Sequence, residues 1–199
     1  MTIRQQATES ERTSDRKTPH TARDLFDALP PLPGFRAEVI EGKLIVSPLG
    51  TPEHVWVAAD LHDALLPLRK ERGWRGAPGG TNVCIEGSRD SLVPDYVLSP
   101  PDCPRWGTLE LKSSGVLMVA EVVSPSSMHT DHHEKRRIYA QGGVPVYLLI
   151  DPRPKHPTVT VFSHLDDGAY QTRTSVAMGT PLLLPHPVDF ELDTSIFKA

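Results

Sequence analysis

The segment V-L-M-V-A-E-V-V-S-P-S, from Val116 to Ser126, is the clearest structural signal in the sequence. Seven of its first eight residues are apolar, which predicts a β-strand buried on both faces. Glu121 is the one exception. An ionised carboxylate in such a strand costs roughly several kcal/mol unless a partner or a cation compensates it. We therefore expect a functional role for Glu121, the alternative being a structural ion pair with a core arginine.

A second apolar run, V-P-V-Y-L-L-I-D, ends at Asp151 and predicts another buried strand. Between the two runs, Asp131 to Gln141 is expected to form a helix that Gly142-Gly143 closes. Two apolar strands joined by a helix indicate a parallel crossover unit. Glu121 and Asp151 should then lie at the carboxyl ends of their strands, where ligands gather in open α/β sheets.

Asp95 lies in a third apolar run, L-V-P-D-Y-V-L. Pro94 directly before it suggests a sheet edge or a bulge, which can redirect the next side chain. The alternative is that Asp95 caps a turn, since Pro-Asp pairs are common in turns.

The remaining segments carry recognisable boundary signals. A helix is expected over 22–29 with Thr21 as N-cap, and a hairpin around Glu41-Gly42. A longer helix is expected from Glu53 to Arg72, ended by Gly73, and a strand over 81–86. The segment 99–114 is rich in proline, gives no strand or helix signal, and is expected to be a loop. Antiparallel strands are expected over 158–163, 169–177 and 181–184.

Length and composition favour one α/β domain. The chain has 199 residues, of which 38% are hydrophobic and 23% charged, as in ordinary soluble globular proteins. Residues 1–20 are polar and lack aromatic side chains, so a disordered tail is expected there and a single domain over residues 21–199.

Charge and cysteine content restrict the possible partners. The formal net charge of −4 provides no basic field over the whole protein, so any contact with nucleic acid needs a local patch or a metal ion. Cys84 and Cys103 belong to no metal-binding motif, which fits a reduced, cytoplasmic setting. Neither a membrane-spanning run nor a signal-peptide core is recognisable.

Three of these side chains suit metal-dependent hydrolysis of a phosphodiester. Such a reaction needs an activated water and neutralisation of charge on the phosphoryl oxygens. Asp95 and Glu121 could hold Mg²⁺ or Mn²⁺, which prefer oxygen ligands. Lys135 could orient the water and stabilise negative charge, or could form only an i, i+4 ion pair with Asp131, worth about 0.3–0.5 kcal/mol.

Several short motifs together resemble the Uma-two family, endonucleases of the PD-(D/E)XK, restriction-endonuclease-like superfamily. The resemblance covers roughly residues 35–165. Its motifs are Pro94-Asp95, E-V-V-S-P-S from Glu121, the spacing of Asp131, Lys135 and Tyr139, G-V-P-V-Y-L-L-I-D-P from Gly143, A-E-V-I-E-G-K-L-I-V-S-P from Ala37, and His54.

The resemblance implies a mixed β-sheet flanked by helices, extended by an antiparallel C-terminal segment. It implies that Asp95 and Glu121 are metal ligands and Lys135 the catalytic lysine, with Glu38 and His54 as auxiliaries. In the usual superfamily pattern the lysine comes two residues after the acid, where this chain has Val123. A lysine on the following helix is shared within the family.

Other candidate sites were weighed against this one. His129, His132 and His133 could bind zinc or nickel, or could simply be solvated side chains at a helix start. Glu38 is expected to face solvent unless its strand lines the cleft, and His54 could be a surface residue. No G-x-S-x-G, P-loop or dinucleotide motif is present.

The sequence thus predicts a Mg²⁺- or Mn²⁺-dependent endonuclease that acts on DNA, and a homodimer is expected. The alternative is a non-catalytic DNA-binding or protein-interaction module that retains the fold. The acidic net charge gives that alternative some support.

Overall fold

The computed structural model describes residues 18–153 and 155–197. Most of the expected N-terminal tail lies outside these residues. The helices are α1 (Ala22–Ala28), α2 (Pro52–Ala64), α3 (Leu66–Arg72) and α4 (Arg136–Gln141), and a π-helical segment (Thr130–Lys135) runs directly into α4.

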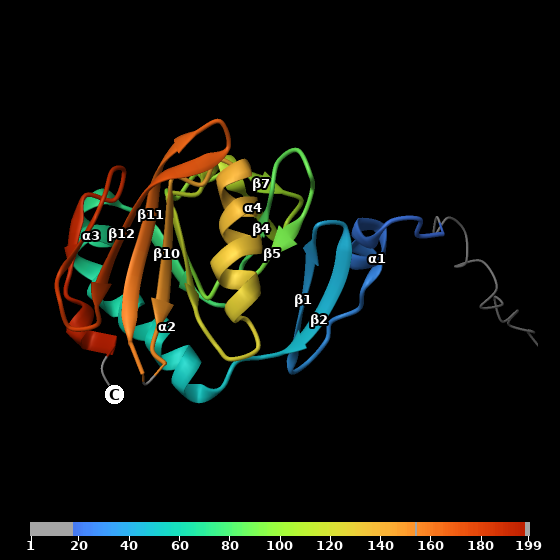
Figure 1. Cartoon of the computed structure of the whole chain (residues 1–199). Helices are drawn as coiled ribbons and strands as arrows, with labels where there is room; N and C mark the ends of the chain where they lie inside the picture. The colour runs from blue at the N-terminus through green and yellow to red at the C-terminus, as the bar shows by residue number, and fades with distance from the viewer. Residues whose placement is uncertain (1–17, 154, 198–199) are drawn as a thin grey trace, which may run out of the picture.

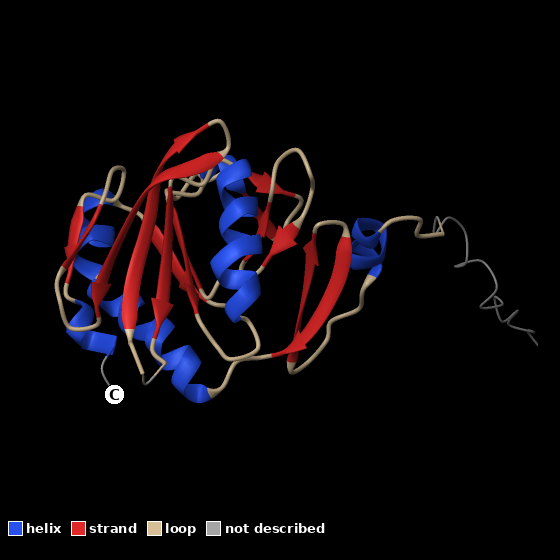
Figure 2. Ribbon diagram, in the orientation of Figure 1, coloured by secondary structure: helices blue, strands red, loops and turns tan. Residues whose placement is uncertain are grey.

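The main sheet has the strand order β12-β11-β10-β9-β6-β3 (Figures 1 and 2). Its strands are β3 (Arg75–Pro78), β6 (Tyr96–Ser99), β9 (Met118–Val122), β10 (Val146–Asp151), β11 (Thr158–Asp166) and β12 (Ala169–Ala177). Strands β9 and β10 are parallel and the other pairs are antiparallel, which confirms the crossover and the antiparallel C-terminal extension.

A smaller sheet has the order β2-β1-β5-β4-β8-β7. Its strands are β1 (Phe35–Ile40), β2 (Lys43–Pro48), β4 (Asn82–Cys84), β5 (Ser91–Leu92), β7 (Arg105–Trp106) and β8 (Glu110–Lys112). A separate hairpin joins β13 (Leu182–Leu184) and β14 (Phe190–Leu192), and short 3-10 turns cover Ser113–Gly115 and Thr194–Phe197.

Helices cover both faces of the main sheet. Leu61 of α2 and Leu68 of α3 belong to the core on one face, together with Ala120 of β9. Ile138 and Tyr139 of α4 pack on the opposite face. Figure 1 shows α4 in front of the sheet, with α2 and α3 behind it. This mixed sheet between helices is the fold class that the sequence predicted.

Local signals in the sequence located the N-terminal elements correctly. Thr21 and Asp24 form a reciprocal capping box at the start of α1. Glu41 and Gly42 both have positive φ, 50° and 71°, as the tight turn between β1 and β2 requires. The hairpin and α1 lie together at one end of the molecule (Figure 1).

Two expectations about secondary structure were wrong. The helix expected over 53–72 breaks at Leu65, because Pro67 has no N–H to continue the hydrogen bonding of α2. The segment 99–114, which gave no signal, contains β7 and β8. These strands are too short to show a hydrophobic period, and β8 is placed by parallel pairing with the distant β4.

Candidate active site

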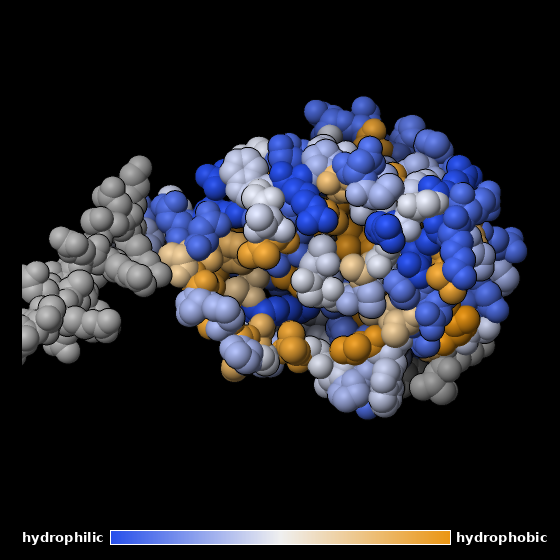
Figure 3. Space-filling model, turned by 180° about the vertical axis from the view of Figure 1, so that it is seen from behind, coloured by the Kyte–Doolittle hydropathy of each residue, from blue (hydrophilic) through white to orange (hydrophobic). Residues whose placement is uncertain are grey.

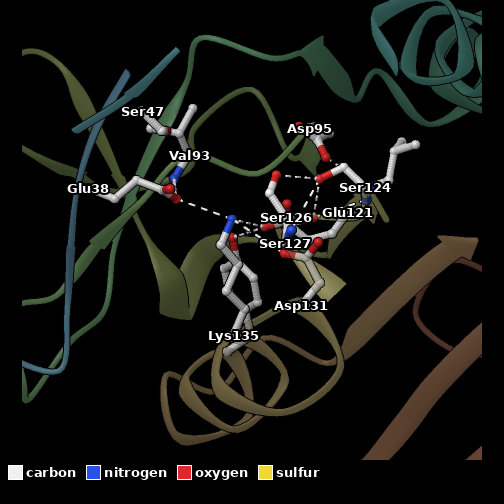
Figure 4. A network of polar contacts seen from close by, with 12 residues as sticks. Glu38, Ser47, Val93, Asp95, Glu121, Ser124, Ser126, Ser127, Asp131 and Lys135 are labelled. Carbon is white, nitrogen blue, oxygen red and sulfur yellow. Dashed lines mark hydrogen bonds and ion pairs between the residues drawn. The ribbon is translucent and has the colours of Figure 1, made fainter. Parts of the chain in front are cut away.

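Lys135 occupies the centre of a buried polar cluster (Figure 4). It is the last residue of the π-helical segment and is 2% exposed. Its Nζ lies 3.0 Å from Glu121 Oε1, 3.2 Å from Glu38 Oε1 and 3.8 Å from Asp131 Oδ1. Burial alone would lower the pKa of Lys135, but these carboxylates raise it above its ordinary value. Lys135 is therefore held as a cation.

Glu121 extends from β9 toward Lys135. Its Oε1 accepts hydrogen bonds from Lys135 Nζ and from the Tyr139 hydroxyl, each at 3.0 Å. Glu121 is 1% exposed, and burial raises its pKa well above the ordinary value. Lys135 opposes this rise in pKa, whereas the nearby acids Asp95 and Asp131 add to it. The partner of this carboxylate is thus a lysine and not the core arginine considered above.

Asp95 lies just before β6, where the strand register brings it beside Glu121. Its Oδ2 accepts the Val122 N–H at 2.8 Å and lies 2.8 Å from His54 Nε2. Its Oδ1 lies 3.3 Å from Arg36 Nη1. Burial alone would raise the pKa of Asp95, but the hydrogen bond and charge of His54 and the hydrogen bond from Val122 hold it below its ordinary value. Asp95 is therefore the more readily ionised of the two paired acids.

Glu38 faces the cluster, which corrects the expectation that it faces solvent. It is 3% exposed, and its Oε1 accepts the Val93 N–H at 2.8 Å. The reason is the position of β1, which lies between β2 and β5 and is buried over its last residues. Arg36, two residues earlier on the same strand, places its Nε 3.8 Å from Glu38 Oε2.

Sequence reasoning missed Asp131 and Arg36 as members of the site. Asp131 is 1% exposed, and its Oδ1 has no hydrogen-bond partner among the described residues. Burial raises its pKa, although Lys135 and a hydrogen bond from Ser127 oppose the rise. The spacing of Asp131, Lys135 and Tyr139 on one helix face was a usable signal. For Arg36 the only signal is its position two residues before Glu38, which puts both side chains on one face of a strand.

Acids outnumber fixed cations in this cluster. Four carboxylates meet two cations that stay charged near neutral pH, which leaves an excess of two negative charges (4 − 2) when all are ionised. The carboxylates are those of Glu38, Asp95, Glu121 and Asp131, and the cations are Arg36 and Lys135. The cluster therefore favours bound protons or an added cation, consistent with the raised pKa values.

A cleft of about 730 Å³ opens beside the cluster, between the β1–β2 hairpin, α2 and the turn that follows β9. Its polar wall includes Arg36, Glu38, His54, Asp131 and Lys135. Glu121 does not line the cleft, but it contacts Lys135, which does. The cleft is thus a place where an anion would meet Lys135 and Arg36 directly.

The histidine cluster does not form a metal site. His129 Nδ1 lies 3.4 Å from Glu134, His132 Nε2 lies 3.8 Å from Asp151, and His133 is exposed. Among residues 18–153 and 155–197, no three Asp, Glu, His or Cys side chains are arranged around one ion position. The structure therefore does not support a zinc or nickel site at the three histidines. It also shows no set of three ligands already arranged for an ion in the acidic cluster of the described residues.

A mixed sheet with helices on both faces and clustered acids at the carboxyl end of a central strand defines a restriction-endonuclease-like fold. Among solved structures, the crystal structure of "a putative nuclease belonging to DUF820" from Anabaena variabilis is similar, with a TM-score of 0.68 at 20% sequence identity. The match covers 90% of this chain and 97% of the other.

A family model described as "Putative restriction endonuclease" matches residues 23–195, so the chain belongs to this family, Uma2. The resemblance seen in the sequence motifs is thereby confirmed. No curated protein matches the chain. None of the helices in the described part of the chain has the length and apolar character needed to cross a membrane.

Proposed function

We propose that this protein is a metal-dependent endonuclease that hydrolyses DNA phosphodiester bonds. In this proposal Asp95 and Glu121 hold Mg²⁺ or Mn²⁺, and Lys135 lies beside the scissile phosphate. The observation that carries the proposal is the buried, acid-rich cluster around one lysine, at the wall of a cleft. Membership of the nuclease family supports the reaction class.

The donor chemistry of the cluster fits a divalent cation. Carboxylate oxygens are the preferred ligands of Mg²⁺ and Mn²⁺. The excess of negative charge favours an added cation, and so does Asp131 Oδ1, which has the ammonium of Lys135 at 3.8 Å but no hydrogen bond among the described residues. Asp131 is therefore a further candidate ligand. Such an ion, when bound, supplies Lewis-acid charge and a more acidic water.

The residues of the chain would divide the work of hydrolysis. A water oxygen bonds to phosphorus and gives up a proton to solvent, while the bond from phosphorus to the leaving sugar oxygen breaks and that oxygen takes up a proton. Lys135 and Arg36, on the cleft wall, neutralise charge that develops on the phosphoryl oxygens. His54, held 2.8 Å from Asp95, can carry a proton to the leaving oxygen. Glu38 and Glu121 keep the ammonium of Lys135 in position.

Incubation with plasmid DNA tests the activity directly. With Mg²⁺ or Mn²⁺, purified protein is expected to convert supercoiled plasmid to nicked and linear forms, and EDTA should stop the conversion. Linear duplex and single strands are tested in parallel. If every substrate stays intact with both ions, the non-catalytic binding module is the better account.

Metal binding is expected to strengthen as the pH rises. Burial raises the pKa values of Glu121 and Asp131, whereas the pKa of Asp95 is lowered, so protons compete with the ion for Glu121 and Asp131 more than for Asp95. Calorimetric titration with Mn²⁺ should therefore show an affinity that rises by up to about 10-fold per pH unit for each displaced proton between pH 6 and pH 8.

The calorimetric experiment has two controls. Glu121→Ala should lose Mn²⁺ binding, and Glu71→Ala, at an exposed position on α3, should keep it. An affinity that is independent of pH, or equal binding by the Glu121 variant, would exclude Glu121 from the ligand set.

We propose in addition a homodimer in a cytoplasmic setting. The free thiols of Cys84 and Cys103, both buried, agree with a reducing environment. A dimer would present two sites to the two strands of a duplex.

A further inference from the structure

A large apolar hollow adjoins the candidate active site. Its volume is about 990 Å³, and it lies between α1, the start of β1, α2 and the β7–β8 turn. Phe26, Phe35 and Trp106 contribute aromatic rings to its walls. Figure 3 shows a hollow on this side of the molecule with apolar residues along its walls. Phe35 is 52% exposed and Trp106 39% exposed, so both side chains are accessible to a ligand.

The hollow and the cleft share walls. Arg36 and His54 line both spaces, and Asp95 lines the hollow. A phosphate held at Arg36 and Lys135 would therefore have the adjoining nucleotide of its own strand at the entrance of the hollow. The two spaces together form one path that passes the proposed reaction centre.

The chemistry of the walls selects the group that fits the hollow. A phosphate is poorly accommodated among apolar side chains, whereas a nucleobase has apolar faces that stack on aromatic rings. Each of the three acids in the wall has a cationic partner: Glu110 pairs with Arg23, Asp27 with Arg23 and Arg89, and Asp95 with Arg36. They would therefore repel a polyanion less than free carboxylates.

Cationic groups surround Trp106 at the far side of the hollow. The Arg89 guanidinium lies 4.8 Å and the Lys112 ammonium 5.8 Å from the centre of the Trp106 ring. Arg105 is the neighbouring residue on β7 and is exposed. Positive groups interleaved with aromatic rings are the arrangement by which proteins bind single strands. Arg89 and Lys112 also pair with Asp27 and Glu86, at 3.7 Å and 3.4 Å. In a chain of net charge −4, these residues and Arg105 form a local group of cations for a phosphate backbone.

We propose that the hollow binds an unpaired nucleobase next to the scissile phosphate, so that the preferred substrates are DNA strands with unpaired bases: single strands, flaps and the locally unpaired regions of supercoiled plasmid. This inference rests on the proposed function, because it assigns the substrate of the same site. In an intact duplex the bases are stacked inside the helix and reach such a hollow only when extruded. Stacking on Phe35 and Trp106 supplies the affinity that the acidic net charge does not.

Binding measured without metal tests this inference independently of cleavage. In EDTA and at low salt, fluorescence anisotropy compares a labelled oligothymidylate, an abasic strand of equal length and charge, and a duplex. The oligothymidylate is expected to bind about 10-fold more tightly than the abasic strand. Phe35→Ala and Trp106→Ala should abolish this preference and leave the abasic affinity unchanged, which also shows that the variants are folded.

Leu183→Ala is the matched control, because Leu183 is 66% exposed on β13 and lines neither space. The inference is wrong if wild-type protein binds both strands equally or binds neither. It is also wrong if the hollow is a subunit interface, which would appear in sedimentation as a dimer that Phe35→Asp dissociates. Base-dependent binding without cleavage in Mg²⁺ or Mn²⁺ would instead contradict only the proposed function.

Discussion

Replacing Lys135 with methionine is expected to abolish cleavage and to lower the free energy of unfolding by about 3–5 kcal/mol at pH 7. Methionine keeps most of the side-chain length but removes the ammonium that lies 3.0 Å from Glu121 and 3.2 Å from Glu38. Glu121 and Asp131 then lose their close cation, whereas Glu38 and Asp95 keep Arg36. Loss of charge stabilisation at the phosphate should reduce the rate by at least about 100-fold.

The pH dependence of the Lys135→Met defect separates charge from packing. Without Lys135 the folded-state pKa values of the buried acids rise further, so the folded state is increasingly penalised as the pH rises through them. The loss of stability should therefore be larger at pH 8 than at pH 5. Thermal or urea unfolding over this pH range measures it.

Lys70→Met provides the matched control, because Lys70 is exposed on α3. Its loss should change the free energy of unfolding by less than about 0.5 kcal/mol and leave cleavage unaffected. If Lys135→Met is equally mild, or if its defect does not depend on pH, the ammonium does not compensate the buried acids.

Elements with local chemical signals were predictable from the sequence. The capping box at Thr21, the turn at Glu41-Gly42 and the apolar strand around Glu121 each depend on residues within a few positions. The crossover followed from two such strands and the helix between them. Family resemblance then directed attention to Asp95, which its own dipeptide does not distinguish from a turn.

Features that depend on distant pairing were not predictable in this way. Strand β1 alternates apolar and polar residues from Phe35 to Val39, which puts Arg36 and Glu38 on one face. The pattern does not show whether that polar face meets solvent or the site. The direction of these two side chains is fixed by pairing with β2 and β5. Similarly, the sequence predicted a helix from Asp131 but not that its first turns, over Thr130–Lys135, are π-helical, since a π-helical turn departs from the ordinary α-helical repeat.

Glu121→Gln is expected to separate function from stability, because the two properties place opposite demands on this carboxylate. The amide oxygen of glutamine can keep the hydrogen bonds that Glu121 accepts from Lys135 and Tyr139. Lys135 also retains Glu38 at 3.2 Å. The variant loses the charge that would bind the metal ion. A metal contribution of several kcal/mol corresponds to a loss of at least about 100-fold in cleavage rate.

The stability of Glu121→Gln should equal or exceed that of the wild type. Burial raises the pKa of Glu121, so the folded state favours the protonated acid. At low pH the buried acid therefore does not lower the free energy of unfolding. As the pH rises through the folded-state pKa, the acid ionises and this free energy falls. Glutamine does not titrate. The gain should therefore be near zero at pH 4.5 and reach on the order of 1 kcal/mol at pH 8.

Parallel unfolding and plasmid-cleavage measurements on Glu121→Gln and Glu71→Gln test both halves of this prediction. Glu71 is 75% exposed at its side chain, and its replacement should change neither property. A Glu121 variant that cleaves normally would remove this residue from the reaction. A variant that is less stable than wild type at pH 8 would show that ionised Glu121 stabilises the fold through Lys135, and the acid would then be structural. Only an inactive and more stable variant fits a carboxylate whose burial serves the reaction at the expense of the fold.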